Sequence, residues 1–149
     1  MTPTISNLID EVAERDLLGW ALLGGRCTAH IPTILEECSP DLFGTKTHRD
    51  IVEAILHLLE HGIAIDHLEV VQELRQRGEH GITVDYISDL TTGIVFARPV
   101  TRRTSYLRDL HNRRKLVALA DELSIRACDL TEPLPDLIQN LLTELKNHA

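Results

Sequence analysis

Hydrophobic residues recur along most of the chain at the spacing of one buried helix face, and residues 47–78 show this pattern most clearly. The stripe in the first half of this stretch consists of Ile51, Ala54, Ile55, Leu58 and Leu59. Thr47 stands where a helix N-cap is expected, and Gly62 suits the left-handed residue that follows a helix. The pattern therefore predicts a helix of about four turns between Thr47 and Gly62.

A second helix follows after a joint of only a few residues. Asp66 can accept a hydrogen bond from the amide of Glu69 while the Glu69 side chain reaches back, which is a capping box. Gly78 ends this helix, whose predicted buried face carries Leu68, Val71 and Leu74. Because the joint is so short, we expect Ile63 and Ile65, which flank it, to pin the two helices into one core.

Residues 11–23 predict an earlier helix, whose apolar side carries Val12, Leu17, Leu18, Ala21 and Leu22. Gly19 lies inside it, although glycine in the middle of a helix costs about 1 kcal/mol relative to alanine. Either another backbone packs closely against Gly19, or a helix ends there, or the glycine is merely tolerated. Short helices are expected at residues 31–37 and after Thr83, and Phe43 is expected in the core.

The last third of the chain changes character, because one helical pattern runs from Pro99, which suits a first helical turn, to about Leu130. The apolar side of this helix rotates along its length, at 100° per residue. The side that we expect to face the globular helices carries Val100, Tyr106, Leu107, Leu110 and Val117. The nearly opposite side carries Leu116, Leu119, Ala120, Leu123, Ala127 and Leu130. After a turn at residues 131–133, a final helix carries Leu134, Leu137, Ile138, Leu141, Leu142 and Leu145.

The fold predicted from these patterns is all-α. Residues 1–97 are expected to form a compact helical globular subdomain, and residues 98–149 a helical hairpin built on the long helix. Two helices alone cannot cover both apolar stripes of such a hairpin. We therefore predict self-association, as a dimer or a ring-like oligomer, through Leu119, Leu123, Leu134, Leu137, Leu141 and Leu145. The alternative is that the hairpin folds back and buries these leucines within one chain.

The composition, 43% hydrophobic and 26% charged, is that of an ordinary soluble globular protein. No run approaches the roughly 18 apolar residues that a membrane helix needs, and the N-terminus has no apolar signal segment. We therefore expect a cytoplasmic protein without a membrane partner. The three cysteines, Cys27, Cys38 and Cys128, fit neither a disulfide framework nor a paired zinc knuckle.

The net charge of −8 is unevenly distributed. Residues 98–115 contain seven basic residues and one acidic residue, a net +6, so the remainder of the chain carries −14. A remainder this acidic does not favour wrapping nucleic acid over a broad surface, so contact with DNA is expected to be indirect. Candidate partner-docking residues on this basic stripe are Arg102, Arg103, Arg113 and Arg114. The alternative is a solvated helical face whose arginines pair with acidic residues of the same chain.

His57, Glu60 and His61 match the H-x-x-E-H pattern of zinc hydrolases, in which two histidines one turn apart bind zinc and the glutamate activates water. A small zinc-dependent hydrolase is therefore one alternative function. Such a site also requires a third protein ligand and a dry pocket, whereas Gly62 ends the helix directly after His61. The sequence has no G-x-x-x-x-G-K-[ST] loop for phosphate. We predict no catalytic, cofactor-binding or metal-binding residue in this chain.

A further set of residues occurs in a fixed order along almost the whole chain. Its members are Glu14, Leu18, Gly19, Phe43, His48, Ile51, Ala54, Ile55, Gly62, Ile65, Asp66, Leu74, Gly78, Tyr86, Ile87, Leu90, Tyr106, Arg113, Arg114, Leu116 and Ala120. With these residues at these spacings, the chain resembles the N-terminal domain of the DnaB-like replicative DNA helicases. The helicase-binding end of bacterial primases has a similar fold, but Glu14 with Leu18-Gly19, and Ile65-Asp66, resemble the helicase side. The residues expected to be structural are Gly19, Phe43, Gly62 and Asp66.

The resemblance implies a role as well as a fold. Domains of this family form the collar of a ring-shaped hexamer through their hairpins and offer a docking surface to the primase. It also implies that the ATPase motor, with its ATP and magnesium, belongs to a following domain that is absent from this chain. We therefore expect a non-catalytic assembly and docking domain of DNA replication, with itself and the primase or a helicase loader as partners. The alternatives are the zinc-dependent hydrolase and a small helical nucleic-acid-binding domain.

Overall fold

Helices make up all the regular secondary structure in the ranges that the computed structural model describes, residues 4–94 and 100–148. Their order is η1 (Ile5–Leu8), α1 (Glu11–Gly24), η2 (Thr28–His30), α2 (Ile31–Glu37), η3 (Pro40–Leu42), α3 (Lys46–Glu60), α4 (His67–Gln76), α5 (Val84–Leu90), α6 (Val100–Ala127) and α7 (Leu134–Asn147), where η marks a short 3₁₀ helix. The predicted all-α class is confirmed. None of these helices is long and apolar enough to cross a membrane.

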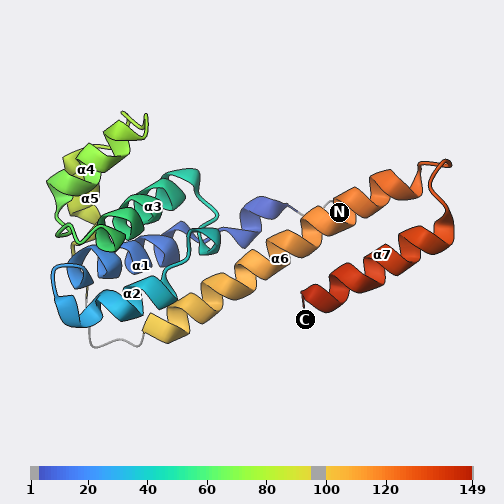
Figure 1. Cartoon of the computed structure of the whole chain (residues 1–149), viewed down its shortest axis with the longest axis horizontal. Helices are drawn as coiled ribbons and strands as arrows, with labels where there is room; N and C mark the ends of the chain where they lie inside the picture. Colours follow the sequence, from blue (N-terminus) through green and yellow to red (C-terminus); the bar gives the residue numbers. More distant parts are fainter. Residues whose placement is uncertain (1–3, 95–99, 149) are drawn as a thin grey trace.

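Helices α1 to α5 gather into one body, and α6 runs from that body as a long rod along which α7 folds back (Figure 1). Within the body, α1 packs against α3, α5 and α6. The side chains of Leu17, Leu18 and Ala21 on α1 are fully buried. They join Phe43, which is buried as predicted, and Ile55 of α3 in one hydrophobic cluster. The first half of α6 belongs to the same cluster, so the body and the long helix share a core.

The predicted turn signals are present at the joint between α3 and α4. Gly62 has a φ of +68°, which is the left-handed conformation. The Asp66 carboxylate accepts a hydrogen bond from the Glu69 amide at 2.8 Å and so caps α4. Of the two isoleucines that flank the joint, Ile65 is buried, whereas Ile63 is 41% exposed. The prediction for Ile63 is therefore wrong, and only Ile65 ties the joint to the core.

Gly19 marks a close approach between α1 and the end of α5. A Cβ atom added to Gly19 would overlap the carbonyl oxygen of Leu90 and lie 2.7 Å from Cδ1 of Ile94. No side chain larger than hydrogen fits there without displacing backbone. Close packing of another backbone is therefore confirmed, and the alternative of a helix end at Gly19 is wrong, because α1 continues to Gly24.

Three details of the predicted helix ends are wrong. Helix α3 begins at Lys46 rather than after Thr47, and Thr45 occupies its N-cap position without a capping side-chain hydrogen bond. Val12 and Leu68 are exposed, although their helical angles predict burial. Both lie in the first turn of a helix. A residue there can point to the same side as the buried residues and still lie beyond the ends of the helices that cover that side.

The buried side of α6 rotates along its length. In the first half, Thr104, Leu107 and Leu110 are buried against the body. Tyr106 is 47% exposed, so the prediction that it faces the globular helices is wrong. Its phenol reaches the edge of the body instead, where it donates a hydrogen bond to Asp10 at 3.1 Å.

The second half of α6 packs against α7 rather than against the body. Leu119 and Leu137 are buried there, outside the main hydrophobic cluster. Helix α6 ends at Ala127, earlier than predicted, and Leu130 lies in the turn with 97% of its surface exposed. Pro99 and the predicted boundary between residues 97 and 98 fall outside the described ranges.

Candidate functional site

One flank of the hairpin is apolar and open to solvent. The exposed fractions are 44% for Leu116, 64% for Leu134, 49% for Ile138, 48% for Leu142 and 42% for Leu145. Single exposed leucines are ordinary on protein surfaces, but a contiguous row of them marks an interaction surface. We call these five residues the apolar flank.

Helix geometry places the members of the apolar flank on the same side of the hairpin. Leu119 of α6 and Leu137 of α7 are the buried residues of the hairpin and mark the side on which each helix meets the other. Leu116 lies about 60° around α6 from Leu119, and Ile138 lies about 100° around α7 from Leu137. Because the helices run in opposite directions, these two rotations lead to the same side.

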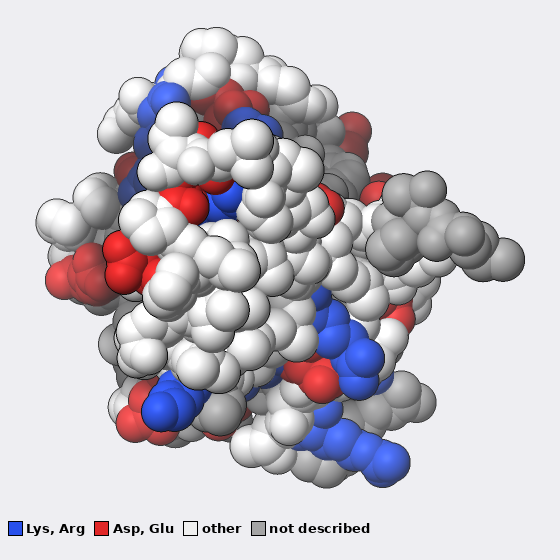
Figure 2. Space-filling model, turned by 90° about the vertical axis from the view of Figure 1, so that its right-hand side faces the viewer, with Lys and Arg blue, Asp and Glu red and all other residues white. Residues whose placement is uncertain are grey.

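A cluster of charged residues lies near the turn of the hairpin. The Arg126 guanidinium donates from Nε to Oε2 of Glu132 at 3.1 Å and lies 3.6 Å from Oε1 of Glu122. A view onto the end of the molecule that carries the hairpin turn shows uncharged residues in the middle of the face and charged residues around it (Figure 2).

The structure divides the six leucines that the sequence predicted for self-association. Leu119 and Leu137 lie between α6 and α7, so they hold the hairpin together. The half-buried members of the set are Leu123 and Leu141. The members on the apolar flank are Leu134 and Leu145. The apolar-flank residues that the sequence analysis did not select as site residues are Leu116, Ile138 and Leu142; placing the two helices antiparallel on a helical wheel could have found them.

Two arginines of the basic stripe fasten α6 to the body. The Arg114 guanidinium donates to backbone carbonyl oxygens of η1 and η3, at 2.7 Å from Leu8 and 3.4 Å from Leu42. Arg103 forms an ion pair with Asp16 of α1. Arg103 and Arg114 thus bind other parts of the same domain. Their guanidinium groups are less available to a partner than those of the other two predicted docking arginines.

The other two predicted docking arginines face solvent. Arg113 donates to Asp109 one turn earlier at 2.8 Å, and its side chain is 61% exposed. Arg102 is also exposed. The two arginines lie about 20° apart around α6, so they share one line along the helix surface. Arg102 and Arg113 therefore share one solvent-facing side of α6, about three turns apart, whereas Arg103 and Arg114 contact the body.

A buried polar network joins α1, α3 and α5. Glu14 is 0% exposed and His48 is 2% exposed, with Oε2 of Glu14 at 2.6 Å from Nδ1 of His48. The same carboxylate accepts hydrogen bonds from the amides of Gly44 at 2.5 Å and Thr45 at 3.4 Å. Nε2 of His48 lies 3.0 Å from the hydroxyl oxygen of Tyr86. The network therefore anchors the segment before α3 to α1.

The pairing of Glu14 with His48 was not predicted from the sequence. The available signal was the position of Glu14, a carboxylate three and four residues before the buried Leu17 and Leu18 on the apolar side of its helix. Burial alone would raise the pKa of Glu14, but the hydrogen bonds from His48 and the Gly44 amide outweigh it, and the pKa lies below its usual value of 4.5.

His57 and His61 of the zinc-hydrolase pattern lie next to each other, with ring centroids 4.1 Å apart. Within residues 4–94 and 100–148, no group of three or more His, Cys, Asp or Glu side chains is arranged to hold a metal ion. Hydrolytic zinc needs three protein ligands and an open position. The described residues therefore do not assemble the site that the hydrolase alternative requires.

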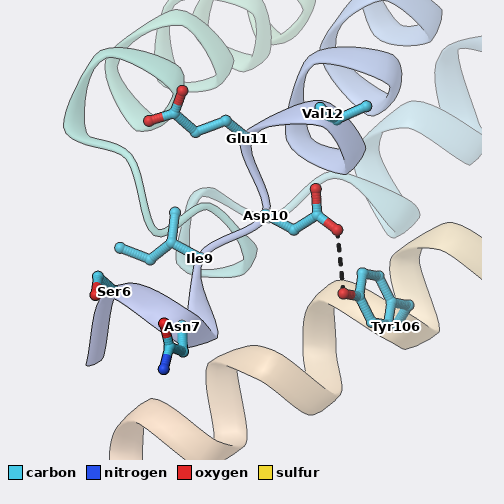
Figure 3. Close-up of a pocket in the computed structure, with 7 residues that line it drawn as sticks. All are labelled: Ser6, Asn7, Ile9, Asp10, Glu11, Val12 and Tyr106. Atoms are coloured by element: carbon cyan, nitrogen blue, oxygen red, sulfur yellow. Dashed lines mark hydrogen bonds between the residues drawn. The ribbon is translucent and has the colours of Figure 1, made fainter. Parts of the chain in front are cut away.

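An open pocket lies where the N-terminal segment meets α6 (Figure 3). It is lined by Ser6, Asn7, Ile9, Asp10, Glu11, Val12 and Tyr106. The hydrogen bond to Asp10 raises the pKa of the Tyr106 phenol, and the same Asp10 side chain caps α1 by accepting from the Ala13 amide at 3.0 Å. The polar contacts of this pocket therefore hold α6 to the start of α1.

The sequence of this chain matches the family model of the DnaB-like helicase N-terminal domain over residues 7–122. The chain belongs to this family. The DnaB N-terminal domain is a non-catalytic domain of a replicative helicase. The resemblance inferred from the sequence is confirmed.

A solved structure shows the same fold. The crystal structure of the N-terminal domain of DnaB helicase from Mycobacterium tuberculosis is similar to this chain with a TM-score of 0.77 and 23% sequence identity. The similarity covers 93% of this chain and 97% of that chain, so it extends beyond the part that the family model matches. A search of curated protein sequences finds no match.

Proposed function

We propose that this DnaB-like domain is an assembly and docking module, which associates with copies of itself through the apolar flank of its hairpin. The observation that carries the proposal is the row of five half-exposed apolar side chains on one side of α6 and α7. Membership of a family of oligomeric helicases supports it. A two-fold contact between identical hairpins would cover both copies of the flank at once and form a four-helix packing.

The size of the apolar flank indicates a moderate affinity. Between 42% and 64% of each of the five side chains is exposed, and full burial of one such side chain contributes roughly 1.5–3 kcal/mol. The part still exposed is thus worth about 1 kcal/mol per side chain, or roughly 10 kcal/mol for the ten side chains of a two-fold contact. Association itself costs roughly 4–15 kcal/mol. The assembly is therefore expected to depend on protein concentration.

Light scattering coupled to size-exclusion chromatography tests this proposal. Leu142→Glu should give a folded monomer, because it places a charge in the middle of the contact. Thr143→Glu is the matched control: it introduces the same charge one residue away, at an exposed position on the far side of α7 from the apolar flank. Equal association of the two variants would contradict the proposed surface.

The exposed arginines of α6 are the second part of the proposed function. Arg102 and Arg113 lie on one solvent-facing line of the helix, and we assign to that line the docking of an acidic surface on the primase or helicase loader. Arginine suits this role because its planar guanidinium binds carboxylates through two hydrogen bonds. In this proposal the domain contacts DNA only indirectly, through such partners.

A further inference from the structure

The last turn of α3 carries two histidines that do not contribute to the hairpin or to the basic stripe. His57 and His61 are one helical turn apart, and their rings lie 4.1 Å apart with a tilt of 37° between the ring planes. The side chain of His57 is 39% exposed, and His61 is exposed. The pair therefore stands on the surface of the body with its rings already close together.

The contacts of each ring fix which nitrogen is available to a ligand. Nδ1 of His61 lies 2.8 Å from the carbonyl oxygen of His57. A carbonyl only accepts, so this Nδ1 carries the proton and Nε2 of His61 holds the free lone pair. Nδ1 of His57 is buried and lies 3.0 Å from Oε1 of Glu73 on α4, but the two atoms are not aligned for a hydrogen bond. A carboxylate likewise favours a proton on that nitrogen, so in the neutral ring the exposed side of His57 offers Nε2.

This arrangement is typical of metal-binding histidines. Such residues usually bind the ion through one ring nitrogen while the other donates to a carboxylate or a backbone carbonyl, which fixes the ring. Here the carboxylate is that of Glu73, which is itself held by Arg77 through a hydrogen bond of 2.8 Å from Nε. The carbonyl is that of His57. The hydrogen bond behind His61 is therefore formed before any ion binds, and the Glu73 carboxylate lies beside Nδ1 of His57.

We propose that His57 and His61 form a chelating site for one divalent transition-metal ion through their Nε2 atoms. Imidazole pairs suit copper, nickel and zinc, and affinity for these ions follows the order in which Cu²⁺ exceeds Ni²⁺ and Zn²⁺. Water completes the coordination, because the described residues offer no group of three ligands. The C-terminal end of α3 adds the partial negative charge of the helix dipole. The ion cross-links the last turn of α3, where it is backed by α4.

Titration calorimetry with the full chain tests the site, using CuCl2, NiCl2, ZnCl2 and MgCl2 as separate probes at about pH 7.5, where unperturbed histidine is neutral. The expected result is one ion bound per chain, tightest for Cu²⁺, with no binding of Mg²⁺. His61→Ala and His57→Gln should each weaken the binding about tenfold or more. His80→Ala is the matched control, since His80 is an exposed histidine outside the pair, and it should bind as the original chain does.

Glu73→Gln tests whether the carboxylate beside His57 contributes to the metal affinity of the histidine pair. It keeps both ligands but removes the charge behind His57, so the metal affinity should fall about tenfold while circular dichroism stays unchanged. Binding that survives the combined change of His57 and His61, or a wild-type chain that takes up no copper, would overturn the proposal. Neither result would bear on the hairpin, whose association is measured without metal.

Discussion

The buried carboxylate of Glu14 provides the sharpest test of how the body is held together. Glu14→Gln keeps the shape of the side chain but removes its charge and replaces one acceptor oxygen with a donor. Both oxygens face donors: Oε1 accepts from the Gly44 amide, and Oε2 accepts from the Thr45 amide and lies beside Nδ1 of His48. The variant therefore loses charge-assisted hydrogen bonds and leaves at least one buried donor without an acceptor.

The magnitude follows from the number of contacts. Hydrogen bonds to charged groups contribute roughly 1.5–3 kcal/mol each, and the two short contacts of Glu14 are of this kind. The free energy of unfolding should therefore fall by roughly 3–5 kcal/mol. At roughly 2–4 °C per kcal/mol for a chain of this size, the melting temperature should fall by about 10 °C.

Chemical denaturation of the Glu14→Gln variant measures this loss, and its pH dependence checks the cause. The pKa of Glu14 in the folded chain is below 4.5, and its value in the unfolded chain is close to 4.5. The stabilisation is therefore complete above about pH 4.5 and is lost as the pH falls through the lower, folded-state pKa. The original chain should lose stability in that window, and the variant should lose less.

The His48→Gln variant and the double variant complete a thermodynamic cycle. Because Glu14 and His48 bond each other directly, their two losses should not add, and the coupling should be roughly 1 kcal/mol or more. A Glu14→Gln variant within about 0.5 kcal/mol of the original chain, which is the range of ordinary surface changes, would refute the reasoning.

Three further predictions follow from single contacts. Asp66→Ala should lower the free energy of unfolding by about 1 kcal/mol in urea denaturation, because it removes the cap of α4; an unchanged midpoint would contradict that role. Gly19→Ala should cost roughly 1–3 kcal/mol by pushing α1 away from Leu90, and a thermal melt that equals the original would show that the approach is loose. Arg114→Glu should lower the melting temperature through its lost carbonyl contacts, whereas Arg113→Glu should leave it nearly unchanged and weaken only the binding of the primase in surface plasmon resonance. Equal effects of the two changes on both measurements would mean that the stripe is one solvated face.

Helices α3 and α4 could be predicted from the sequence because each has an apolar period and a chemical signal at one end. Asp66 caps α4 through its own side chain, and Gly62 adopts the one backbone conformation that its position requires. The signal was weaker at Thr47, because Thr45, two residues earlier, takes the cap position without a side-chain hydrogen bond. Whether a residue in the first turn is buried, as was expected of Val12 and Leu68, depends on which other helices pack beside it. The apolar pattern of one helix does not contain this information.

The surfaces were harder to predict because they depend on which helix packs against which. The apolar stripe of α7 was evident, but only the packing of α7 on α6 shows that Leu137 is covered and Ile138 is open. The arginines of α6 look alike in the sequence, yet Arg114 reaches carbonyl oxygens from segments far away in the chain. Contacts between residues far apart in the sequence produce no periodic pattern along the chain. The sequence could therefore identify the candidate arginines but not which of them bind within the domain.

Sedimentation equilibrium of the unaltered chain tests whether the hairpin joins copies of this domain. The monomer has a mass of 16.8 kDa. The account predicts an average mass that exceeds this value and rises with protein concentration toward a dimer or a larger ring, because the apolar flank is buried only between copies. A folded chain that stays at the monomer mass at every concentration up to the solubility limit would contradict it.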